Sequence, residues 1–339
     1  MKLDDKNKKI SVTSKDVANY AKVSQATVSR VFSRQSYVKE ETVKRVMDAA
    51  RALGYTPNLI ARSLNSRQTD LIAVVTVHFD NPFYQTLITK LSEMISALGK
   101  QMLFIQSPFE SDLDEILDRV LQYQVDGVVV LSAAISSQMV DKFIQIKSPL
   151  VIFNKQFDSR YFFSVCSDNV DSGAMVAEFF VEQGYESFGY ISGDMLKQTS
   201  GNRYKGYTQQ LAKRGYHKCS VVNGDYSYQS GYEAILKMKK QEGGILPQAV
   251  FCANDLMAFG AMDAVRHELG LRIPQDVAFV GFDDLEQSSW EGYQLTSVAQ
   301  PVDEMVEYTK NYLYKKLNSI ETSGGYVLLK CNMVKRNSA

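Results

Sequence analysis

The sequence predicts a small all-α helix-turn-helix domain followed by a two-lobed α/β domain with doubly wound parallel sheets. Three short amphipathic segments precede residue 57, and two sets of apolar runs alternating with helical stretches follow residue 70. Residues 1–67 hold 14 Lys/Arg and 6 Asp/Glu, a net charge of +8, whereas the remaining residues hold 24 and 32, a net charge of −8. A basic head on an acidic body indicates that the head meets a polyanion, although basic faces are also often merely solvated.

The length and composition are those of a globular protein with two or three domains. The 339 residues are 45% hydrophobic and 22% charged, and the first ten contain no apolar run typical of a signal peptide. We see no convincing membrane span in the sequence. The 4 cysteines are scattered without CxxC spacing, which favours reduced thiols in a cytoplasmic protein.

The first helix candidate opens at the segment TSKD, where Thr13 and Asp16 match a capping box. Its apolar face consists of small side chains, namely Val17, Ala18 and Ala21. A turn at residues 22–23 leads to the second candidate, for which Ser24 is a natural N-cap. Small residues on the first helix and an apolar residue in the turn permit a close crossing of the two helices, as in a helix-turn-helix.

The second candidate, SQATVSRVFS, is a poor helix former in isolation. With Val28 and Val31 facing inward, its outer face carries Gln25, Ala26, Ser29 and Arg30. Such a face suits the major groove of DNA, because Gln and Arg can pair with base edges and Ala can contact a thymine methyl. The alternative is a structural bundle with a solvated polar face, which the weak helix propensity and the basic charge disfavour.

The third candidate ends at Gly54 and carries apolar residues at helical intervals, namely Val43, Val46, Met47, Ala50 and Leu53. The following segment, PNLIARSLNSRQTD at 57–70, could form two turns of helix, too short to persist alone.

The whole head resembles the DNA-binding head of the LacI/GalR family of bacterial transcriptional regulators, most specifically in AKVSQATVSRV followed by GYTPN. The resemblance implies that Gln25, Ala26 and Arg30 read bases. The full set of implied DNA-binding residues in the helical region is Thr13, Ser14, Ser24, Gln25, Ala26, Thr27, Ser29 and Arg30. Two departures stand out: Lys22 replaces the usual turn Gly, and Lys39 replaces the usual Ser N-cap, a loss of about 1 kcal/mol.

For residues 58–69 the resemblance implies a hinge helix that orders on DNA. Asn58, Ala61 and Leu64 then contact DNA or the dimer mate, with Leu64 wedged between bases in the minor groove. A flexible linker with an incidental Leu is the alternative, but ARSL matches the family at each position.

The body reads as two sets of near-continuous apolar strands separated by helices, which implies parallel sheets covered on both faces. The first set is 71–77, 101–106, 127–132 and 150–154, and the second is 187–192, 220–225, 249–255 and 277–284. Ligands bind beyond the carboxyl ends of such strands. Those ends carry the polar segments DNPFY (80–84), NK (154–155), ND (254–255) and FDD (282–284).

The body resembles the family's effector domain, which is similar to periplasmic sugar-binding proteins, in strings such as NRYKGY, GDYSYQSGY and CANDLMAFGAMDAV. The ligand contacts that this implies are Phe83, Tyr84, Asn154, Arg203, Tyr226, Asn254, Asp283 and Gln300. Aromatic rings that face sugar C–H groups and charged groups that bind neighbouring hydroxyls suit such a ligand. Asn154 stands where many sugar-binding members carry Asp, and core packing is an alternative for any single aromatic.

The predicted boundaries are 1–57 for the DNA-binding domain, 58–69 for the hinge and 70–339 for the effector domain. We assign 70–166 and 300–323 to the first lobe, and 167–298 and 326–337 to the second. The three crossovers between lobes are expected near 165–169, 297–301 and 322–326.

The 3 histidines form no metal-binding motif, and no GxGxxG, Walker-type loop or Gly-x-Ser-x-Gly elbow occurs. We therefore expect no catalytic residue, metal or cofactor. The expected protein is a cytoplasmic, sugar-responsive transcriptional repressor, a homodimer or higher oligomer that binds a pseudo-palindromic duplex operator and no membrane. An exported or soluble sugar-binding protein and a sugar-acting enzyme are the alternatives, and whether the effector induces or corepresses stays open.

Overall fold

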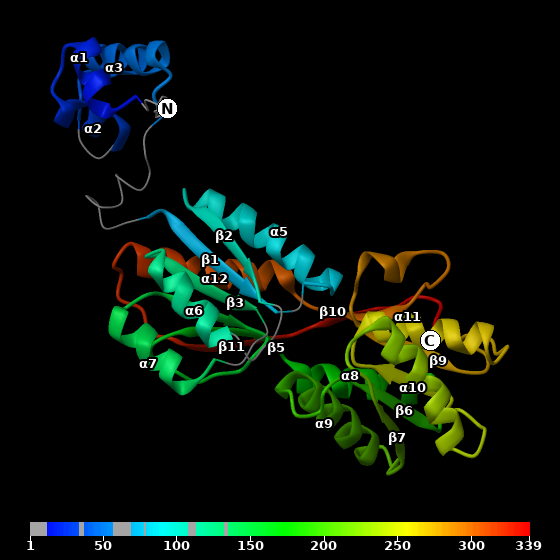
Figure 1. Ribbon diagram of the computed structural model, residues 1–339. Coiled ribbons are helices and arrows are strands. Elements are labelled where there is room, and N and C mark those ends of the chain that lie inside the picture. Colours follow the sequence, from blue (N-terminus) through cyan, green and yellow to red (C-terminus); the bar gives the residue numbers. More distant parts are fainter. Residues whose placement is uncertain (1–11, 34–36, 57–68, 78, 108–112, 132–134) are drawn as a thin grey trace, which may run out of the picture. The chain divides into compact units, whose positions relative to one another are not determined.

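The computed structural model describes residues 12–33, 37–56, 69–77, 79–107, 113–131 and 135–339 (Figure 1). The chain divides into two compact units, Met1–Thr69 and Asp70–Ala339. In the part that the structure describes, no helix is both long and apolar enough to cross a membrane.

The first unit contains three helices, α1 (Ser14–Ala21), α2 (Gln25–Ser33) and α3 (Glu40–Leu53). Thr13 and Asp16 form the predicted capping box, because each side chain hydrogen-bonds the other residue's backbone N–H. The turn between α1 and α2 needs a left-handed residue, and Lys22 supplies it with φ 53° and ψ 48°. A Gly would adopt this conformation without steric cost, so the turn carries some strain.

The core of this unit is made of small side chains that allow the helices to approach closely. Its buried residues are Val17, Ala18, Ala21, Val28, Val31, Val46, Ala49 and Ala50. Met47 departs from the predicted apolar face of α3, since 39% of its surface is exposed and Ala49 is buried instead. Lys39 at the N-cap of α3 makes no side-chain capping bond, as its departure from the family predicts.

The second unit contains two lobes, each built on a six-stranded sheet. The first sheet has the order β11-β5-β4-β3-β1-β2. Its strands are β1 (Leu71–Thr76), β2 (Gln101–Gln106), β3 (Gly127–Leu131), β4 (Leu150–Phe153), β5 (Phe163–Ser167) and β11 (Gly325–Leu329). All pairings within it are parallel.

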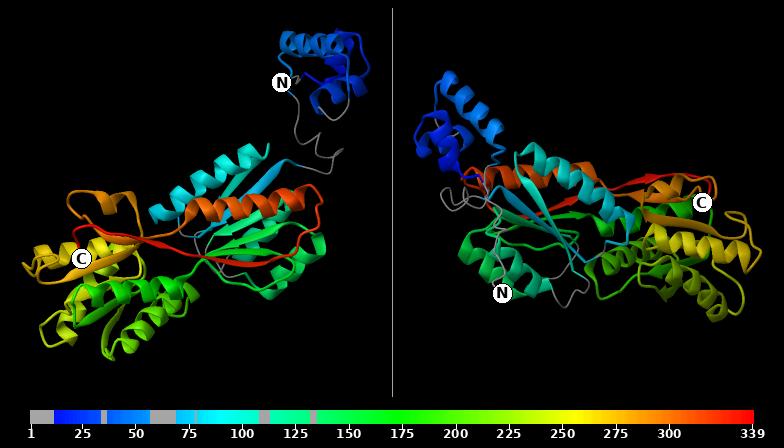
Figure 2. Two further views of the ribbon diagram at one scale, coloured as in Figure 1. Left: turned by 180° about the vertical axis from the view of Figure 1, so that it is seen from behind. Right: turned by 45° about the horizontal axis from the view of Figure 1, so that its top comes forward.

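Helices cover both faces of the first sheet (Figures 1 and 2). One face packs on α5 (Pro82–Ala97) and α12 (Val302–Leu317), and the other on α6 (Leu113–Gln122) and α7 (Ser137–Ile146). Within β1, Val74 belongs to the cluster on the α5 side, whereas Val75 belongs to the cluster on the α6 side. Burial of both faces explains why the inner strands β1, β3 and β4 are continuous apolar runs in the sequence.

The second sheet has the order β12-β10-β9-β8-β6-β7, and it is parallel except where β12 pairs with β10. Its strands are β6 (Phe188–Ser192), β7 (Cys219–Asn223), β8 (Ala249–Cys252), β9 (Ala278–Asp283), β10 (Thr296–Ala299) and β12 (Asn332–Val334). Its helices pack in pairs, α8 (Asn169–Glu182) with α9 (Gln198–Lys213) and α10 (Tyr228–Gln241) with α11 (Asp255–His267). A short 3₁₀ helix, η2 (Glu286–Ser289), follows β9.

The third predicted crossover is wrong. The run 326–337 was assigned to the second lobe, but β11 at Gly325–Leu329 pairs with β5 in the first sheet. The chain crosses only after Leu329, before β12 joins β10. An apolar run in the sequence indicates that a strand is buried. It does not indicate which sheet the strand joins, because the hydrogen-bonding partners of the strand lie far away in the sequence.

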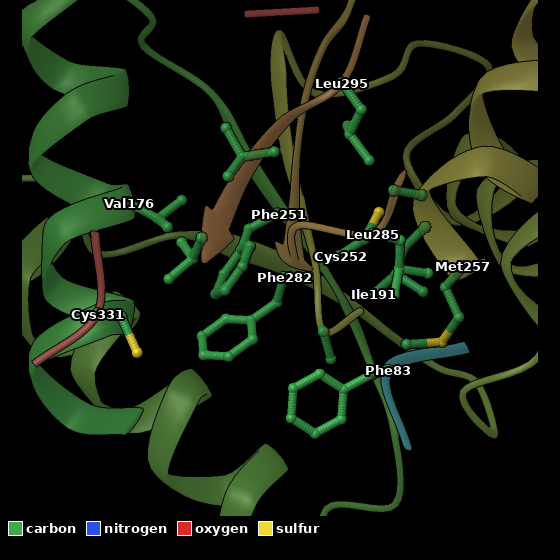
Figure 3. Close-up of a cluster of buried hydrophobic side chains, with 14 of the residues drawn as sticks. Phe83, Val176, Ile191, Phe251, Cys252, Met257, Phe282, Leu285, Leu295 and Cys331 are labelled. Carbon is green, nitrogen blue, oxygen red and sulfur yellow. The ribbon is translucent and has the colours of Figure 1, made fainter. Parts of the chain in front are cut away.

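Buried apolar side chains from both lobes meet near the crossovers (Figure 3). Phe282 and Phe251 come from adjacent strands of the second sheet, whereas Phe83 comes from α5 of the first lobe. Phe83 and Phe282 belong to one continuous cluster of buried residues. This cluster forms the apolar side of the site described next.

Candidate functional site

A pocket of about 310 Å³ lies between the two lobes, at the carboxyl ends of their strands. All the effector contacts implied by the family resemblance line it, namely Phe83, Tyr84, Asn154, Arg203, Tyr226, Asn254, Asp283 and Gln300. Except for Tyr226, each of these residues is at most 9% exposed. The pocket therefore gathers buried polar groups from seven separate segments of the chain.

Three of these residues have backbone conformations that L-residues rarely adopt. Asn154, Tyr226 and Asp283 have φ values of 57°, 71° and 116°. Asn154 directly follows β4 and Asp283 ends β9, whereas Tyr226 lies in the loop between β7 and α10. Backbone strain of this kind concentrates at binding and catalytic sites.

Asp283 is the buried carboxylate of the pocket. It accepts a hydrogen bond of 2.7 Å from Gln300 Nε2. The side chain of Asn81, the N-cap of α5 in the other lobe, also hydrogen-bonds it. Burial raises the pKa of Asp283 to about 6, although Arg203, Gln300 and Asn81 all act to lower it.

Arg203 is held in place by contacts on several sides. Its Nε donates to Asn169 Oδ1 at 2.8 Å, and Nη1 donates to the carbonyl oxygen of Ala253. Its Cζ lies 3.3 Å from the centre of the Phe282 ring, a cation–π contact. Nη2 donates to no group among the described residues, so the second arm of the guanidinium is available to a ligand.

The position of Arg203 depends on a close crossing of α8 and α9. A Cβ at Gly173 would lie 2.1 Å from the carbonyl oxygen of Arg203, and one at Gly206 would lie 1.9 Å from that of Val170. Only glycine fits at either position, and the close crossing carries Arg203 to the edge of the pocket.

Asn254 has a structural role beyond the predicted contact with a ligand. Its Oδ1 accepts from Met257 N at 3.0 Å and caps α11, and its Nδ2 donates to the carbonyl oxygen of Tyr226 at 2.9 Å. The side chain therefore joins the start of α11 to the loop that carries Tyr226. One N–H of the amide remains for a ligand.

Tyr226 presents a hydroxyl that is buried and has no hydrogen-bond partner within the described ranges. Its ring packs on Gly193, where a Cβ would lie 2.0 Å from the ring. A buried hydroxyl without a partner costs about 1–3 kcal/mol. Tyr226 lines the pocket, so a ligand that reaches this hydroxyl would supply the missing partner.

The sequence reasoning missed other polar residues of the pocket. They are Asp80, Asn81, Lys197, Thr199, Asp225, Ser227 and Tyr228. Asp80 and Asn81 belong to the strand-end segment DNPFY, so a wider reading of that segment would have found them. Lys197 and Thr199 carry no comparable signal, because they precede or begin a helix without a recognisable motif.

Asp255 is fully buried beside the pocket without lining it. Its carboxylate accepts from Leu285 N, Ser288 Oγ and Ser297 Oγ at 2.8, 2.7 and 2.6 Å. Burial, helped by the nearby charge of Asp283, raises the pKa of Asp255 to about 7. Asp255 thus ties α11 to the loop after β9 and to β10.

In the first unit, α2 presents the predicted recognition face to solvent. Gln25, Ala26, Ser29 and Arg30 are exposed, whereas Val28 is 1% exposed. Gln25 Nε2 donates to Ser14 Oγ on α1 at 2.9 Å, which orients the amide.

The N-terminus of α2 is capped by Ser24. Its Oγ accepts from Thr27 N at 3.1 Å and lies 2.9 Å from Thr27 Oγ1. Thr13 and Ser14 lie at the N-terminus of α1. The predicted hinge residues Asn58, Ala61 and Leu64 lie outside the described residues.

Two protein-family models match the chain. The model described as bacterial regulatory proteins of the lacI family matches residues 13–58, and the model of the periplasmic binding protein-like domain matches residues 177–339. The first match covers the three helices, and the second covers most of the second lobe.

Full-length relatives agree with both matches. The chain is 28% identical over 332 residues to the HTH-type transcriptional repressor PurR of Pasteurella multocida (strain Pm70), covering 96% of this chain and 98% of the relative. The Lac repressor dimer, solved bound to operator and the anti-inducer ONPF, matches with a TM-score of 0.84 at 25% identity, covering 97% and 99% of the two chains. The complex of the transcriptional regulator CelR with cellobiose matches with a TM-score of 0.73 at 27% identity, covering 97% and 100%. The chain therefore belongs to the LacI family of bacterial regulatory proteins.

Proposed function

We propose that the protein is a homodimeric transcriptional repressor of the cytoplasm that binds a pseudo-palindromic operator and responds to a sugar or sugar derivative. Relatives over nearly the full length are repressors, and the matching solved structures hold operator DNA or cellobiose. These likenesses favour a regulator over an enzyme and over an exported binding protein.

The observation that carries the effector assignment is the mixed chemistry of the pocket. Asp283 supplies hydrogen-bond acceptors and Arg203 supplies donors, while the amide of Asn154 can do both. Each sugar hydroxyl both donates and accepts, so a polyol can satisfy such a set, with its C–H faces against Phe83 and Tyr226.

On the DNA side, we assign Gln25, Ala26 and Arg30 to base edges, because they are exposed together on one face of α2. Contacts with phosphates are assigned to the hydroxyl residues at the helix N-termini and beside them, namely Thr13, Ser14, Ser24, Thr27 and Ser29. The segment 58–69 acts as the hinge between residues 1–57 and the effector domain, with Asn58, Ala61 and Leu64 toward the minor groove.

The test begins with the full-length protein and a random duplex library, from which repeated selection recovers the preferred site. We expect an inverted repeat, and we expect one class of sugar from a panel to change operator affinity in fluorescence anisotropy. Sugar binding without any DNA preference would instead support a plain binding protein, and sugar turnover would support an enzyme. Cell fractionation checks the cytoplasmic location.

A further inference from the structure

A second cavity, of about 280 Å³, lies in the first lobe at the end of the sheet opposite to the effector pocket. It opens at the amino end of β4, where Leu150 lines it, whereas Asn154 just beyond the carboxyl end of β4 lines the effector pocket. Four residues of extended strand separate the two sites by about 13 Å. A ligand in one cavity therefore does not occupy the other.

Cations surround this second cavity. Lys147 follows α7, Arg160 precedes β5, and Lys316 lies in the last turn of α12. None of the three forms an ion pair with a carboxylate of the described residues, and no Asp or Glu lines the cavity. Arg160 donates to the hydroxyl of Tyr161 and lies over its ring, and Lys316 lies over an aromatic ring of α12. Neither contact neutralises the charge, so three positive charges around one opening favour an anion.

The charged groups of the cavity are all donors, and its two side-chain hydroxyls, those of Ser148 and Tyr161, both donate and accept. Ser148 Oγ is buried and has no hydrogen-bond partner among the residues that the structure covers. Lys and Arg side chains donate hydrogen bonds and accept none. A neutral polyol would find no carboxylate acceptor here, in contrast to the effector pocket with Asp80, Asp225 and Asp283.

The inner wall is apolar. Phe143, Leu150 and Phe162 are each at most 3% exposed, and all three line the cavity. A flat or apolar group can pack on this wall while an attached anion reaches the cationic rim.

We propose that this cavity binds a small organic anion, a phosphate or carboxylate attached to a flat or apolar body, independently of the effector pocket. The proposal does not depend on the identity of the effector or on the assignment of the operator. The first lobe would then bind a second small molecule in addition to the effector.

Phenyl phosphate is a suitable probe, because it joins a flat ring to a phosphate. In isothermal titration calorimetry with the full-length protein, we expect Arg160→Gln and Lys316→Met each to weaken its binding by about tenfold. Lys315→Met, the same charge change on an exposed neighbour that does not line the cavity, should leave binding unchanged. Phenol and inorganic phosphate should each bind more weakly than phenyl phosphate, and added salt should weaken its binding.

A variant that fills the effector pocket distinguishes binding there from binding in the second cavity. Thr199→Trp places a bulky ring in the effector pocket and should not affect phenyl phosphate. Loss of binding in Thr199→Trp together with normal binding in Arg160→Gln and Lys316→Met would overturn the proposal, as would the absence of any binding by the folded wild-type protein. Melting temperatures confirm that each variant is folded.

Discussion

Gln300 links the carboxylate of Asp283 to the end of β5. Its Nε2 donates to Asp283 Oδ1 at 2.7 Å, and its Oε1 accepts from Ser167 Oγ at 2.9 Å. Asp283 ends a strand of the second lobe, Ser167 ends a strand of the first, and Gln300 lies between β10 and α12. A ligand that competes for Asp283 therefore acts directly on the segments that join the lobes.

This network extends to the other polar anchor of the pocket. Asn169 Nδ2 donates to the carbonyl oxygen of Ser167 at 3.0 Å, and its Oδ1 accepts from Arg203. The backbone N–H of Asp168 donates to the carbonyl oxygen of Leu329, just before the third crossover. Both charged ligand-binding candidates are thus connected to the crossovers through buried hydrogen bonds, which gives effector binding a physical route to a change in lobe arrangement.

Effector affinity should fall as the pH drops through about 6, the raised pKa of Asp283. Protonation removes an acceptor from the pocket, and sugar hydroxyls then lose a charge-assisted partner. Calorimetric titration of the effector between pH 5 and pH 8 measures the effect. Asp283→Asn should bind at least about tenfold more weakly at pH 8 and show little pH dependence. An unchanged pH profile in a folded Asp283→Asn protein would remove this residue from the site.

The carboxylate of Asp283 should also make the stability of the protein depend on pH, and in the opposite direction to effector affinity: stability should fall as the pH rises. Because its pKa is higher in the folded state than the ordinary value for an aspartate, the folded protein binds the proton more tightly than the unfolded chain does. The contribution of Asp283 to the free energy of unfolding is therefore greatest at low pH and declines as the pH rises toward about 6. The contribution of Asp255 to the free energy of unfolding should fall with rising pH in the same way, because its pKa is raised to about 7. Urea unfolding of the wild type and of Asp283→Asn across this range isolates the part due to Asp283.

Gln300→Leu should destabilise the free protein and raise the pKa of Asp283 further. The substitution removes a donor from a buried carboxylate, at a cost of about 1–3 kcal/mol. The pH at which effector affinity is half lost should therefore move upward relative to the wild type. Gln209→Leu, on an exposed position of α9, is the matched control and should alter neither property.

Arg30→Ala should weaken operator binding by about 1–3 kcal/mol if the side chain pairs with a base. The loss on random duplex should be smaller, because phosphate contacts dominate there. Arg51→Ala removes an equal charge from α3, where Arg51 pairs with Asp48, and serves as the control. If anisotropy titrations show that Arg30→Ala loses the same affinity for operator and for random duplex, Arg30 contacts the DNA backbone and not a base.

Leu64→Ala should reduce both operator affinity and DNA bending while leaving effector affinity nearly unchanged. The expectation follows from the family's use of an apolar wedge in the minor groove, which acts only on DNA. A circular-permutation assay measures the bend. Unaltered bending would favour the simple linker for residues 58–69.

Features set by neighbours in the sequence could be predicted. The capping box of Thr13 and Asp16 needs only residues three apart, and the turn at residues 22–23 was predicted from the helix candidates on either side of it. Apolar runs found eight of the twelve strands in the described part of the chain within a few residues of their observed bounds, including the half-exposed edge strands β2 and β7. Eight residues of the pocket were found through the resemblance to the family.

Features set by distant pairing could not be predicted in this way. β5, β10, β11 and β12 are short strands at the crossovers, and their place depends on partners in remote segments. Asn81 lies in the strand-end segment DNPFY, but its hydrogen bond to Asp283 could not be predicted, because its amide reaches that carboxylate from the other lobe. Capping of α11 by Asn254 involves Met257 only three residues later, whereas its hydrogen bond to the carbonyl oxygen of Tyr226 depends on a distant segment.

Tyr226→Phe should separate ligand binding from stability. The Tyr226 hydroxyl is buried without a partner in the described part of the chain, so its removal should leave the melting temperature of the free protein unchanged or raise it. If a sugar hydroxyl pairs with this group, effector affinity should nevertheless fall, by about fivefold to tenfold. Tyr207→Phe is a close control, because the Tyr207 hydroxyl is likewise buried without a partner but does not line the pocket. It should match Tyr226→Phe in stability and the wild type in effector affinity. If both variants bind the effector as the wild type does, the Tyr226 hydroxyl does not contact the ligand, and only the ring of Tyr226 contributes to the site.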